Sequence, residues 1–299
     1  MNTRARIALR LALRAAPALP LALFWRFPTL AARWRNGVSL PALEALHRWT
    51  ARIPFPAAEP AALLLAAAAI AMPVAALIRR RPSLLLRVLE GALLLGGLLA
   101  LLWAPVCLAA SEPRLSAPQA GELEALCRRL IADLNAAPKL PFPAEEILAR
   151  APDVAGPPGR VVKAARYPEW MRALRVSGMF VPLTGEAVVD VSAPAALLPF
   201  TAVHELMHLC GVADEGAANI AAWQRCMAAG GAFADSARLW ALRYAMGMLK
   251  SADGGAERRA RGMMSEALGT LYRASGGNIA PGRPGSYGTL VHWLTNAQT

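Results

Sequence analysis

Two long stretches without charge constrain the fold of this chain more than any other feature. Residues 61–78 form an uncharged run of 18 residues, and residues 91–110 form a second run of 20. Each run is about the length that an α-helix needs to cross the hydrocarbon core of a bilayer. Arg79, Arg80 and Arg81 follow the first run directly, and the positive-inside rule places such a turn in the cytoplasm. The sequence therefore predicts two helices that cross a membrane and return.

A further apolar segment lies near the start of the sequence, behind four arginines. Pro17 and Pro20 interrupt it, so it is expected to be either a first span or a signal anchor. The N-terminal transmembrane region is accordingly predicted to cover residues 1–110, with about three helices at 8–26, 61–78 and 88–110. The expected partner of this region is the lipid bilayer of the cytoplasmic (inner) membrane, which the chain would cross several times.

The basic residues are concentrated in this apolar half. Residues 1–110 hold 13 Arg and 3 Glu, a net charge of +10, whereas residues 111–299 hold 19 basic and 17 acidic residues, a net charge of +2. A nucleic-acid-binding protein would need a basic face on its soluble part, so no nucleic-acid partner is expected. With the arginine turn in the cytoplasm, the soluble part 111–299 is predicted to lie outside it.

The soluble part contains the motif HExxH, as His204-Glu205-Leu206-Met207-His208. Residues four apart lie on the same face of a helix, so the two imidazoles can bind one metal ion. Glu205 lies one step round the helix, where it can act as general base toward a water on that metal. The motif therefore predicts a Zn²⁺ site with His204 and His208 as ligands and Glu205 as the catalytic residue.

The pattern around the motif is mostly helical, with one β-hairpin. Residues 176–191 alternate around a turn at 182–185 and are predicted to form two strands. A sheet edge next to the metal helix would suit a peptidase, because it can pair with an extended substrate. An ordinary hairpin that covers the core is the alternative. Helices are predicted at 121–135, 168–175, 215–228, 235–249 with Asp235-Ser236 as its cap, and 256–273.

A catalytic zinc needs three protein ligands and one open position, so a further ligand is expected after the motif. Asp214 stands ten residues after His204, where HExxHxxGxxD proteases place their third ligand. Glu215 stands next to it, near the start of a second helix that would pack on the first. Because Asp214 also suits the N-cap of that helix, Glu215 is the favoured ligand and Asp214 the alternative. Asn219 is expected to orient a ligand through its amide.

The sequence offers several candidates for the remaining roles in the site. A peptidase needs a donor for the tetrahedral oxyanion, and the candidates are Tyr287, Tyr272, Tyr244 and His292. The four cysteines form no CxxC pair, so they leave the redox compartment undecided. If Cys210 or Cys226 completed a closed shell of four ligands, the metal would be structural and the protein a non-catalytic membrane sensor or scaffold.

A family resemblance is carried by residues 176–223, which contain VPLTGEAVVDV and PFTAVHELMHLCGVADEGAANIAAW and resemble the DUF3810 family. Further matches lie outside this run and extend the resemblance over most of the chain: IPFP at 53–56, LLWAP at 101–105, LYRASGG at 271–277 and SYG at 286–288. The family pattern around the third ligand is similar to GxxxExEAN. This chain keeps Gly211, Glu215 and Asn219 but has Ala217 in place of the second acid, which favours Glu215 as the ligand.

The resemblance implies an N-terminal membrane region of about three helices and a mostly helical α+β zincin-like metallopeptidase domain, similar to gluzincins. Together with the motif, it predicts a membrane-anchored zinc metallopeptidase that cleaves peptide or protein substrates. One rival is an intramembrane protease, in which HExxH lies inside the bilayer and a DG pair would be expected in a second apolar span. The only DG is Asp253-Gly254, which lies among arginines, and this disfavours the rival.

Overall fold

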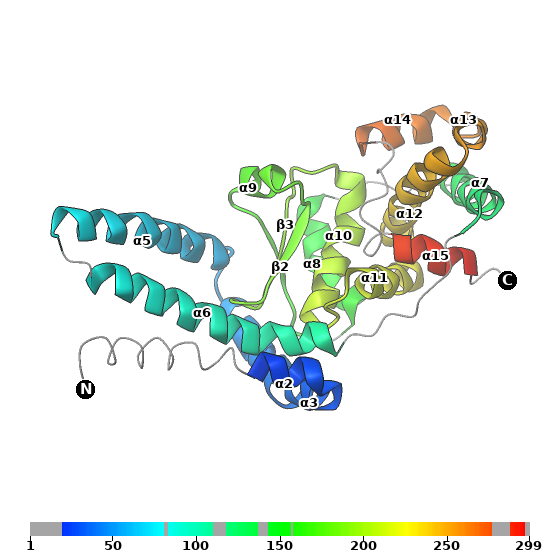
Figure 1. Ribbon diagram of the computed structural model, residues 1–299. Helices are drawn as coiled ribbons and strands as arrows, with labels where there is room; N and C mark the ends of the chain where they lie inside the picture. Colours follow the sequence, from blue (N-terminus) through cyan, green and yellow to red (C-terminus); the bar gives the residue numbers. More distant parts are fainter. Residues whose placement is uncertain are drawn as a thin grey trace. The chain divides into compact units, whose positions relative to one another are not determined.

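The computed structural model describes residues 20–80, 83–109, 118–136, 143–156, 158–276 and 288–296 (Figure 1). The chain divides into two compact units. The first comprises Met1–Ser111 and Val181–Glu186, and the second comprises Glu112–Phe180 and Ala187–Thr299. The turn of a β-hairpin thus belongs to the same unit as the N-terminal helices.

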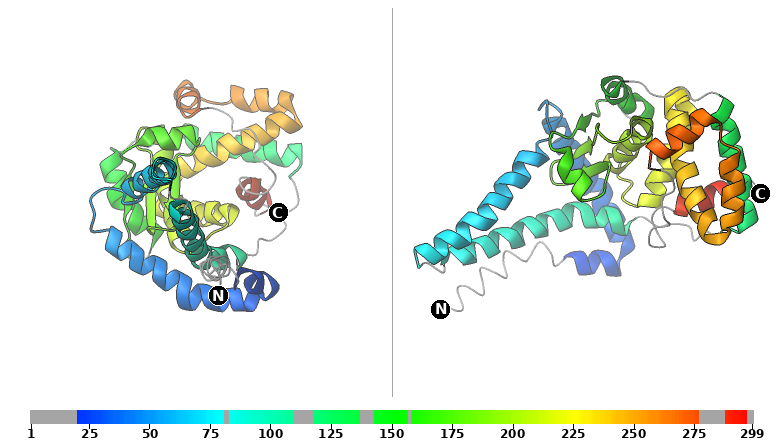
Figure 2. Two further views of the ribbon diagram at one scale, coloured as in Figure 1. Left: turned by 60° about the vertical axis from the view of Figure 1, so that its left-hand side comes forward. Right: turned by 90° about the horizontal axis from the view of Figure 1, so that it is seen from above.

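The described part of the first unit is built from helices. Two of them are long and apolar enough to cross a membrane, and they pack side by side (Figure 2). The helices are α2 (Pro20–Arg26), α3 (Pro28–Trp34), the π-helical segment η2 (Arg35–Ser39), α4 (Leu40–Thr50), α5 (Ala58–Ile78) and α6 (Ser83–Leu108).

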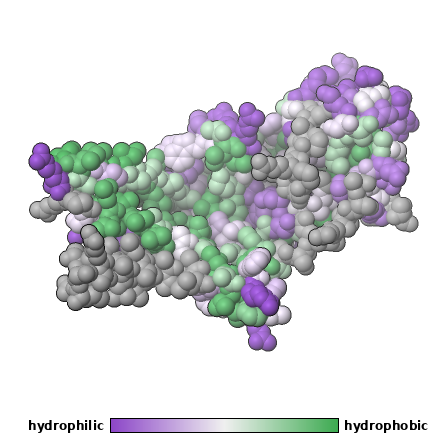
Figure 3. Space-filling model, in the orientation of Figure 1, coloured by the Kyte–Doolittle hydropathy of each residue, from purple (hydrophilic) through white to green (hydrophobic). Residues whose placement is uncertain are grey.

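Helices α5 and α6 are the candidate membrane helices, and most of their surface is exposed in the described unit. Leu64 is 72% exposed and Ile78 is 77% exposed, and the surface of α5 is largely hydrophobic in Figure 3. A helix that is apolar on all sides needs either a protein core or lipid around it. The described residues contain two such helices, not the three predicted. Most of the expected first span, 8–26, lies outside the described residues, and its described remainder is the seven-residue α2.

A proline explains how the earlier helices are fixed to α6. Pro105 lies inside α6 and has no N–H, so the carbonyl of Leu101, four residues before it, loses its helical donor. Trp34 Nε1 donates to this carbonyl at 3.0 Å, and Ser39 Oγ also donates to it at 3.4 Å. These side chains therefore satisfy a polar group that would otherwise face an apolar environment.

The second unit contains a mixed sheet of three strands. Strands β1 (Val162–Ala164), β2 (Gly178–Val181) and β3 (Glu186–Val189) lie in the order β1-β3-β2, and β1 runs parallel to β3 with Val162 opposite Ala187. Every residue of β3 is buried, as expected for a central strand that is covered on both faces. The predicted hairpin is confirmed as β2 and β3, with β2 at one edge of the sheet.

Helix α10 (Leu198–Leu209) lies at the centre of the second unit. All 12 of its residues are buried, and it packs against α8, α11 and α12. The described helices around it are α7 (Ala120–Ala136), α8 (Ala144–Ala155), α9 (Pro168–Ala173), the 3-10 turn η3 (Ala195–Leu197), α11 (Glu215–Ala229), α12 (Gly231–Ala252), α13 (Gly254–Gly262), α14 (Glu266–Ala274) and α15 (Gly288–Asn296). A helix buried all round forms the core of a unit.

Two helix boundaries predicted from the sequence are wrong. Helix α12 begins at Gly231, so Asp235 and Ser236 lie inside it. Their side chains serve other partners: Asp235 pairs with Arg238 at 3.0 Å, and Ser236 Oγ accepts from the backbone N–H of Phe200 in the first turn of α10 at 3.1 Å.

The segment 256–273, predicted as one helix, is divided between α13 and α14. The second of these starts anew because Ser265 Oγ accepts from the N–H of Leu268 at 3.2 Å, which is an N-cap.

Candidate metal centre

The two histidines of the motif project from the same face of α10. His204 and His208 are one helical turn apart, and their Nε2 atoms are 3.2 Å from each other. The helix starts with Pro199 in its first turn and ends at Leu209, after which Gly211 adopts φ +85°. Glycine takes this conformation at no steric cost, so the chain can turn back toward the histidines directly after the helix.

Glu215, the first residue of α11, brings a carboxylate to the two histidines. Its Oε2 lies 3.2 Å from Nε2 of His204, and its Oε1 lies 3.4 Å from Nε2 of His208. These three side chains form a group whose ligand atoms all lie within 4.8 Å of one another. The structure therefore brings together the three residues that the sequence predicted as metal ligands.

The neighbouring acid, Asp214, has a different partner. Its Oδ1 accepts from the backbone N–H of Ala217 at 2.7 Å, which makes Asp214 the N-cap of α11. The group of described residues that could hold a metal ion contains Glu215 and not Asp214.

The spacing of the three donors fits a zinc ion. Zinc binds imidazole nitrogen and carboxylate oxygen at about 2.0–2.2 Å in tetrahedral geometry, which places two ligand atoms about 3.3 Å apart. The two Nε2 atoms are 3.2 Å apart, Nε2 of His204 lies 3.2 Å from Oε2 of Glu215, and Nε2 of His208 lies 3.4 Å from the other oxygen, Oε1. Two imidazoles and a carboxylate also form a donor set that zinc hydrolases use, with a fourth position left open.

The outer nitrogens of the two histidines differ in their partners. Nδ1 of His208 donates to the carbonyl of Val212 at 2.6 Å, which fixes the ring and leaves Nε2 as the nitrogen facing the group. Nδ1 of His204 is buried and has no hydrogen-bond partner among the described residues. Val212 lies in the turn after α10, so the same turn both orients His208 and delivers Glu215.

Glu205 is buried beside the candidate metal group and in contact with strand β2. Its side chain is 6% exposed and accepts from the backbone N–H of Phe180. A Cβ on Gly178 would lie 2.7 Å from Cγ and 2.8 Å from Cδ of Glu205, so only glycine lets the strand approach this closely. The sequence analysis missed Gly178, although a glycine within a strand can indicate such an approach.

The charged groups of the site shift one another's pKa values. Burial raises the pKa of Glu205, and the nearby histidines oppose this only in part. Burial also acts to raise the pKa of Glu215, but hydrogen bonds from His204 and His208 outweigh it and hold that pKa far below its usual value. For His208, burial acts to lower the pKa, whereas the hydrogen bond to Glu215 and the charge of Glu205 raise it above the ordinary value.

The structure describes three of the four candidate oxyanion donors, and Tyr287 lies outside the described residues. Tyr272 is buried, with the Arg261 guanidinium 5.5 Å from the centre of its ring. Tyr244 stacks on Trp240 at 5.4 Å, and His292 lies half-buried on α15. The role of oxyanion donor stays a prediction for these residues. Asn219 is buried on α11, and its predicted role toward a ligand stays a prediction.

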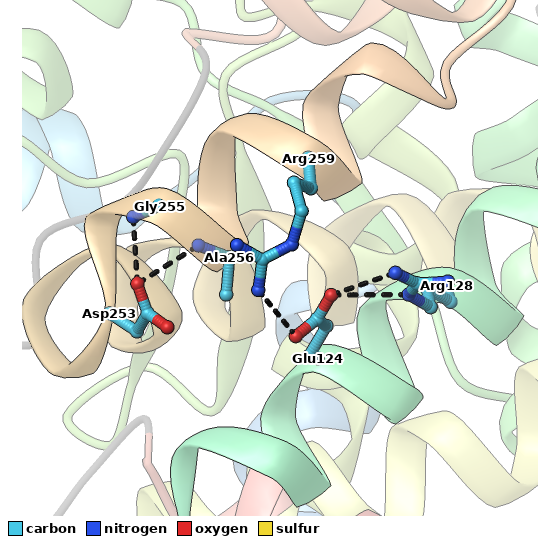
Figure 4. Close-up of polar contacts among 6 residues, drawn as sticks. All are labelled: Glu124, Arg128, Asp253, Gly255, Ala256 and Arg259. Carbon is cyan, nitrogen blue, oxygen red and sulfur yellow. Dashed lines mark hydrogen bonds and ion pairs between the residues drawn. The ribbon is translucent and has the colours of Figure 1, made fainter.

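The residues named for the two rival functions lie elsewhere. Cys210 contacts the Arg160 guanidinium and Cys226 is fully buried, and neither belongs to the candidate metal group of the described residues. Asp253 of the DG pair is exposed and caps α13, where its Oδ1 accepts from Gly255 at 2.8 Å and Ala256 at 3.0 Å (Figure 4).

Fold and site define a mostly helical protein with two candidate membrane helices and a His-His-Glu group, with both histidines buried, that could hold a metal ion. The chain matches a family described as "Protein of unknown function (DUF3810)" over residues 35–278. Because the match covers most of the chain, the protein belongs to the DUF3810 family, and the resemblance seen in the sequence is confirmed. No curated protein and no solved structure matches the chain.

Proposed function

We propose that this protein is a membrane-anchored, zinc-dependent metallopeptidase. The observation that carries the proposal is the group of His204, His208 and Glu215, whose donor atoms have the spacing of a tetrahedral zinc site and lie next to the buried carboxylate of Glu205. A His-His-Glu donor set leaves one coordination position open, which is typical of a catalytic centre.

Glu205 carries the proton transfers in this proposal. A bound zinc ion would polarise the scissile carbonyl and make water a stronger acid. The Glu205 carboxylate would accept the proton of the attacking water and pass it to the leaving amine, so that it acts as general base and then as general acid. Its burial keeps competing water away, and the N–H of Phe180 holds the carboxylate in one orientation.

The position of β2 favours a peptide as the substrate. This strand is at the edge of the sheet, and its residues Gly178 and Phe180 approach Glu205 closely. An edge strand has backbone groups on its open side that can pair with an extended peptide. A peptide held there would run past the base and the metal ligands, which is the arrangement that peptide-bond hydrolysis requires.

We further propose that α5 and α6 cross the cytoplasmic membrane and that the lipid bilayer is the partner of their exposed apolar surface. Arg79 and Arg80 follow α5 directly and favour a cytoplasmic turn between the two helices. The metallopeptidase unit then lies outside the cytoplasm. The nearly balanced charge of residues 111–299 argues against a nucleic-acid partner.

Metal analysis and a cleavage assay on the purified full-length chain test the proposal. The parent and Glu205→Gln should both contain about one zinc per chain, and only the parent should cleave peptides in an unbiased mixture read by mass spectrometry. Loss of acid–base catalysis should lower cleavage by about 10²-fold or more. Zinc in both proteins with no cleavage by either would favour the structural-zinc sensor, and a variant as active as the parent would refute the role of Glu205.

A further inference from the structure

The turn of the β2–β3 hairpin is held by helices of the first unit. Gly185 has φ +66°, and a Cβ on it would lie 2.8 Å from the carbonyl oxygen of Leu43 and 2.9 Å from the N of His47. Nδ1 of His47 donates to the carbonyl of Gly185 at 2.9 Å, and Thr50 Oγ1 donates to the carbonyl of Thr184 at 3.2 Å. Helix α4 therefore packs closely against the backbone of the turn and forms hydrogen bonds with it.

Glu186 adds a second attachment, at the start of the candidate membrane helix α5. Its two carboxylate oxygens accept from the backbone N–H groups of Ala57 and Ala58 at 2.9 and 2.8 Å. The side chain is 1% exposed. A carboxylate is favourable at this position, because the first N–H groups of a helix lack helical partners and carry partial positive charge. The first residue of β3 thus caps α5.

The other end of the hairpin touches the catalytic base. Gly178 of β2 approaches the carboxylate of Glu205 so closely that a Cβ there would clash with it, and the N–H of Phe180 donates to that carboxylate. The ring of Phe180 also stacks near His208, with 6.5 Å between the ring centres. Strand β2 has only four residues, and among the described strands its neighbour in the sheet is β3. A short edge strand of this kind has little stability of its own and depends on its attachments.

From these contacts we infer that Glu186 is a positioning residue for the general base. By capping α5 it fixes the hairpin turn, and the fixed hairpin keeps β2 against the carboxylate of Glu205. The contact that orients the base therefore depends on a hydrogen-bonded attachment at the first turn of a candidate membrane helix. The inference extends the proposed peptidase function. It rests on that function only because Glu205 is taken as the general base.

The chain offers a matched control for a carboxylate that caps a helix. Asp253 also accepts hydrogen bonds from two backbone N–H groups, at the start of helix α13 (Figure 4). Unlike Glu186, Asp253 does not belong to the β2–β3 hairpin. Glu186→Gln and Asp253→Asn each replace a capping carboxylate by the amide of the same shape. If Glu186 were only a cap, both variants would loosen their own helix starts and change nothing at β2.

Hydrogen exchange of the full-length chain in lipid nanodiscs separates these two roles. In Glu186→Gln, the amide of Phe180 should exchange about tenfold faster, as expected for about 1.4 kcal/mol of lost hydrogen-bond stability. Bound zinc should stay at the parent level, and turnover should fall at unchanged KM. Asp253→Asn should change none of these quantities. Faster exchange confined to the start of α5, with β2 unchanged, would overturn the inference, and so would loss of zinc.

A second variant acts from the opposite end of the hairpin. Gly178→Ala should displace the Glu205 carboxylate and speed exchange at Phe180 without affecting the start of α5, because the cap remains. If Glu186→Gln does not fold, this variant decides: unchanged exchange at Phe180 in Gly178→Ala would overturn the inference. If the parent cleaves no peptide, the proposed peptidase fails, whereas the exchange measurements still test whether Glu186 holds β2 in place.

Discussion

Exchanging the carboxylates of Asp214 and Glu215 for amides, one at a time, tests which of the two adjacent acids is a ligand of the proposed zinc ion. Glu215→Gln and Asp214→Asn change neither shape nor size, so each removes mainly the negative charge and one acceptor oxygen. Glu215 lies 3.2 Å from Nε2 of His204 and 3.4 Å from Nε2 of His208, whereas Asp214 accepts from the N–H of Ala217 at 2.7 Å. The structure therefore predicts opposite outcomes for the two variants.

The expected loss of affinity in Glu215→Gln follows from the number of ligands. Binding of zinc to four-ligand structural sites is worth about 10–16 kcal/mol, or roughly 3 kcal/mol for each ligand. The removal of one carboxylate ligand should therefore weaken zinc binding by on the order of 100-fold. In Asp214→Asn the amide oxygen can still accept from Ala217, and Asn caps helices about as well as Asp. Zinc affinity and the free energy of unfolding should both stay close to the parent values.

Both variants can be measured in the full-length protein in detergent. Zinc content is determined after dialysis against buffers of fixed free zinc concentration, and thermal unfolding is recorded on the same samples. Reduced zinc binding in Glu215→Gln, with normal binding in Asp214→Asn, supports the assignment. The reverse pattern would refute it and make Asp214 the third ligand, in the HExxHxxGxxD register.

Two further predictions concern other parts of the chain. A reporter fused at Thr299 should be outside the cytoplasm and one inserted after Arg81 inside it, as alkaline phosphatase and fluorescent fusions would show; a cytoplasmic Thr299 reporter contradicts the proposed topology. Burial raises the pKa of Cys127 from 9.0 to about 12 and also raises that of Cys226. At pH 8 the thiolate of Cys127 in the folded protein should be roughly 10³-fold scarcer than at an ordinary thiol, so both cysteines should react with maleimide only after denaturation; rapid labelling of the native protein would contradict this.

The candidate metal group could be predicted from the sequence because its geometry is local. His204 and His208 are four residues apart on one helix, so their side chains lie on the same face. A short turn through Gly211 then brings Glu215 back to them. The choice between Asp214 and Glu215 also followed from local rules, since the residue before a helix is the one whose side chain caps it. In the structure Asp214 has this capping role and Glu215 lies at the histidines.

The contacts of the hairpin could not be predicted in the same way. Glu186 caps a helix that starts 128 residues earlier in the chain, and Gly178 meets Glu205 only because the fold brings β2 to α10. No periodicity encodes contacts of this kind. The prediction for Ser236 was wrong for the opposite reason. Its position in the sequence suggested a local helix cap, but its hydroxyl accepts a hydrogen bond from the N–H of Phe200, 36 residues away. Local patterns give the correct residue type and the wrong partner when a tertiary contact satisfies the group instead.

Ala217 stands where the resemblance described above implies an acid, and its position can be interpreted from the helix on which it lies. With Asp214 as N-cap, Glu215 is the first residue of α11 and position 217 is the third. Side chains two residues apart on a helix point in different directions, so an acid at 217 would point away from the histidines that Glu215 faces. An acid at this third position instead interacts with the exposed N–H groups of the first turn. An acid at position 217 would thus be a helix-capping residue rather than a further ligand, and Ala217 leaves the three-donor group of His204, His208 and Glu215 intact.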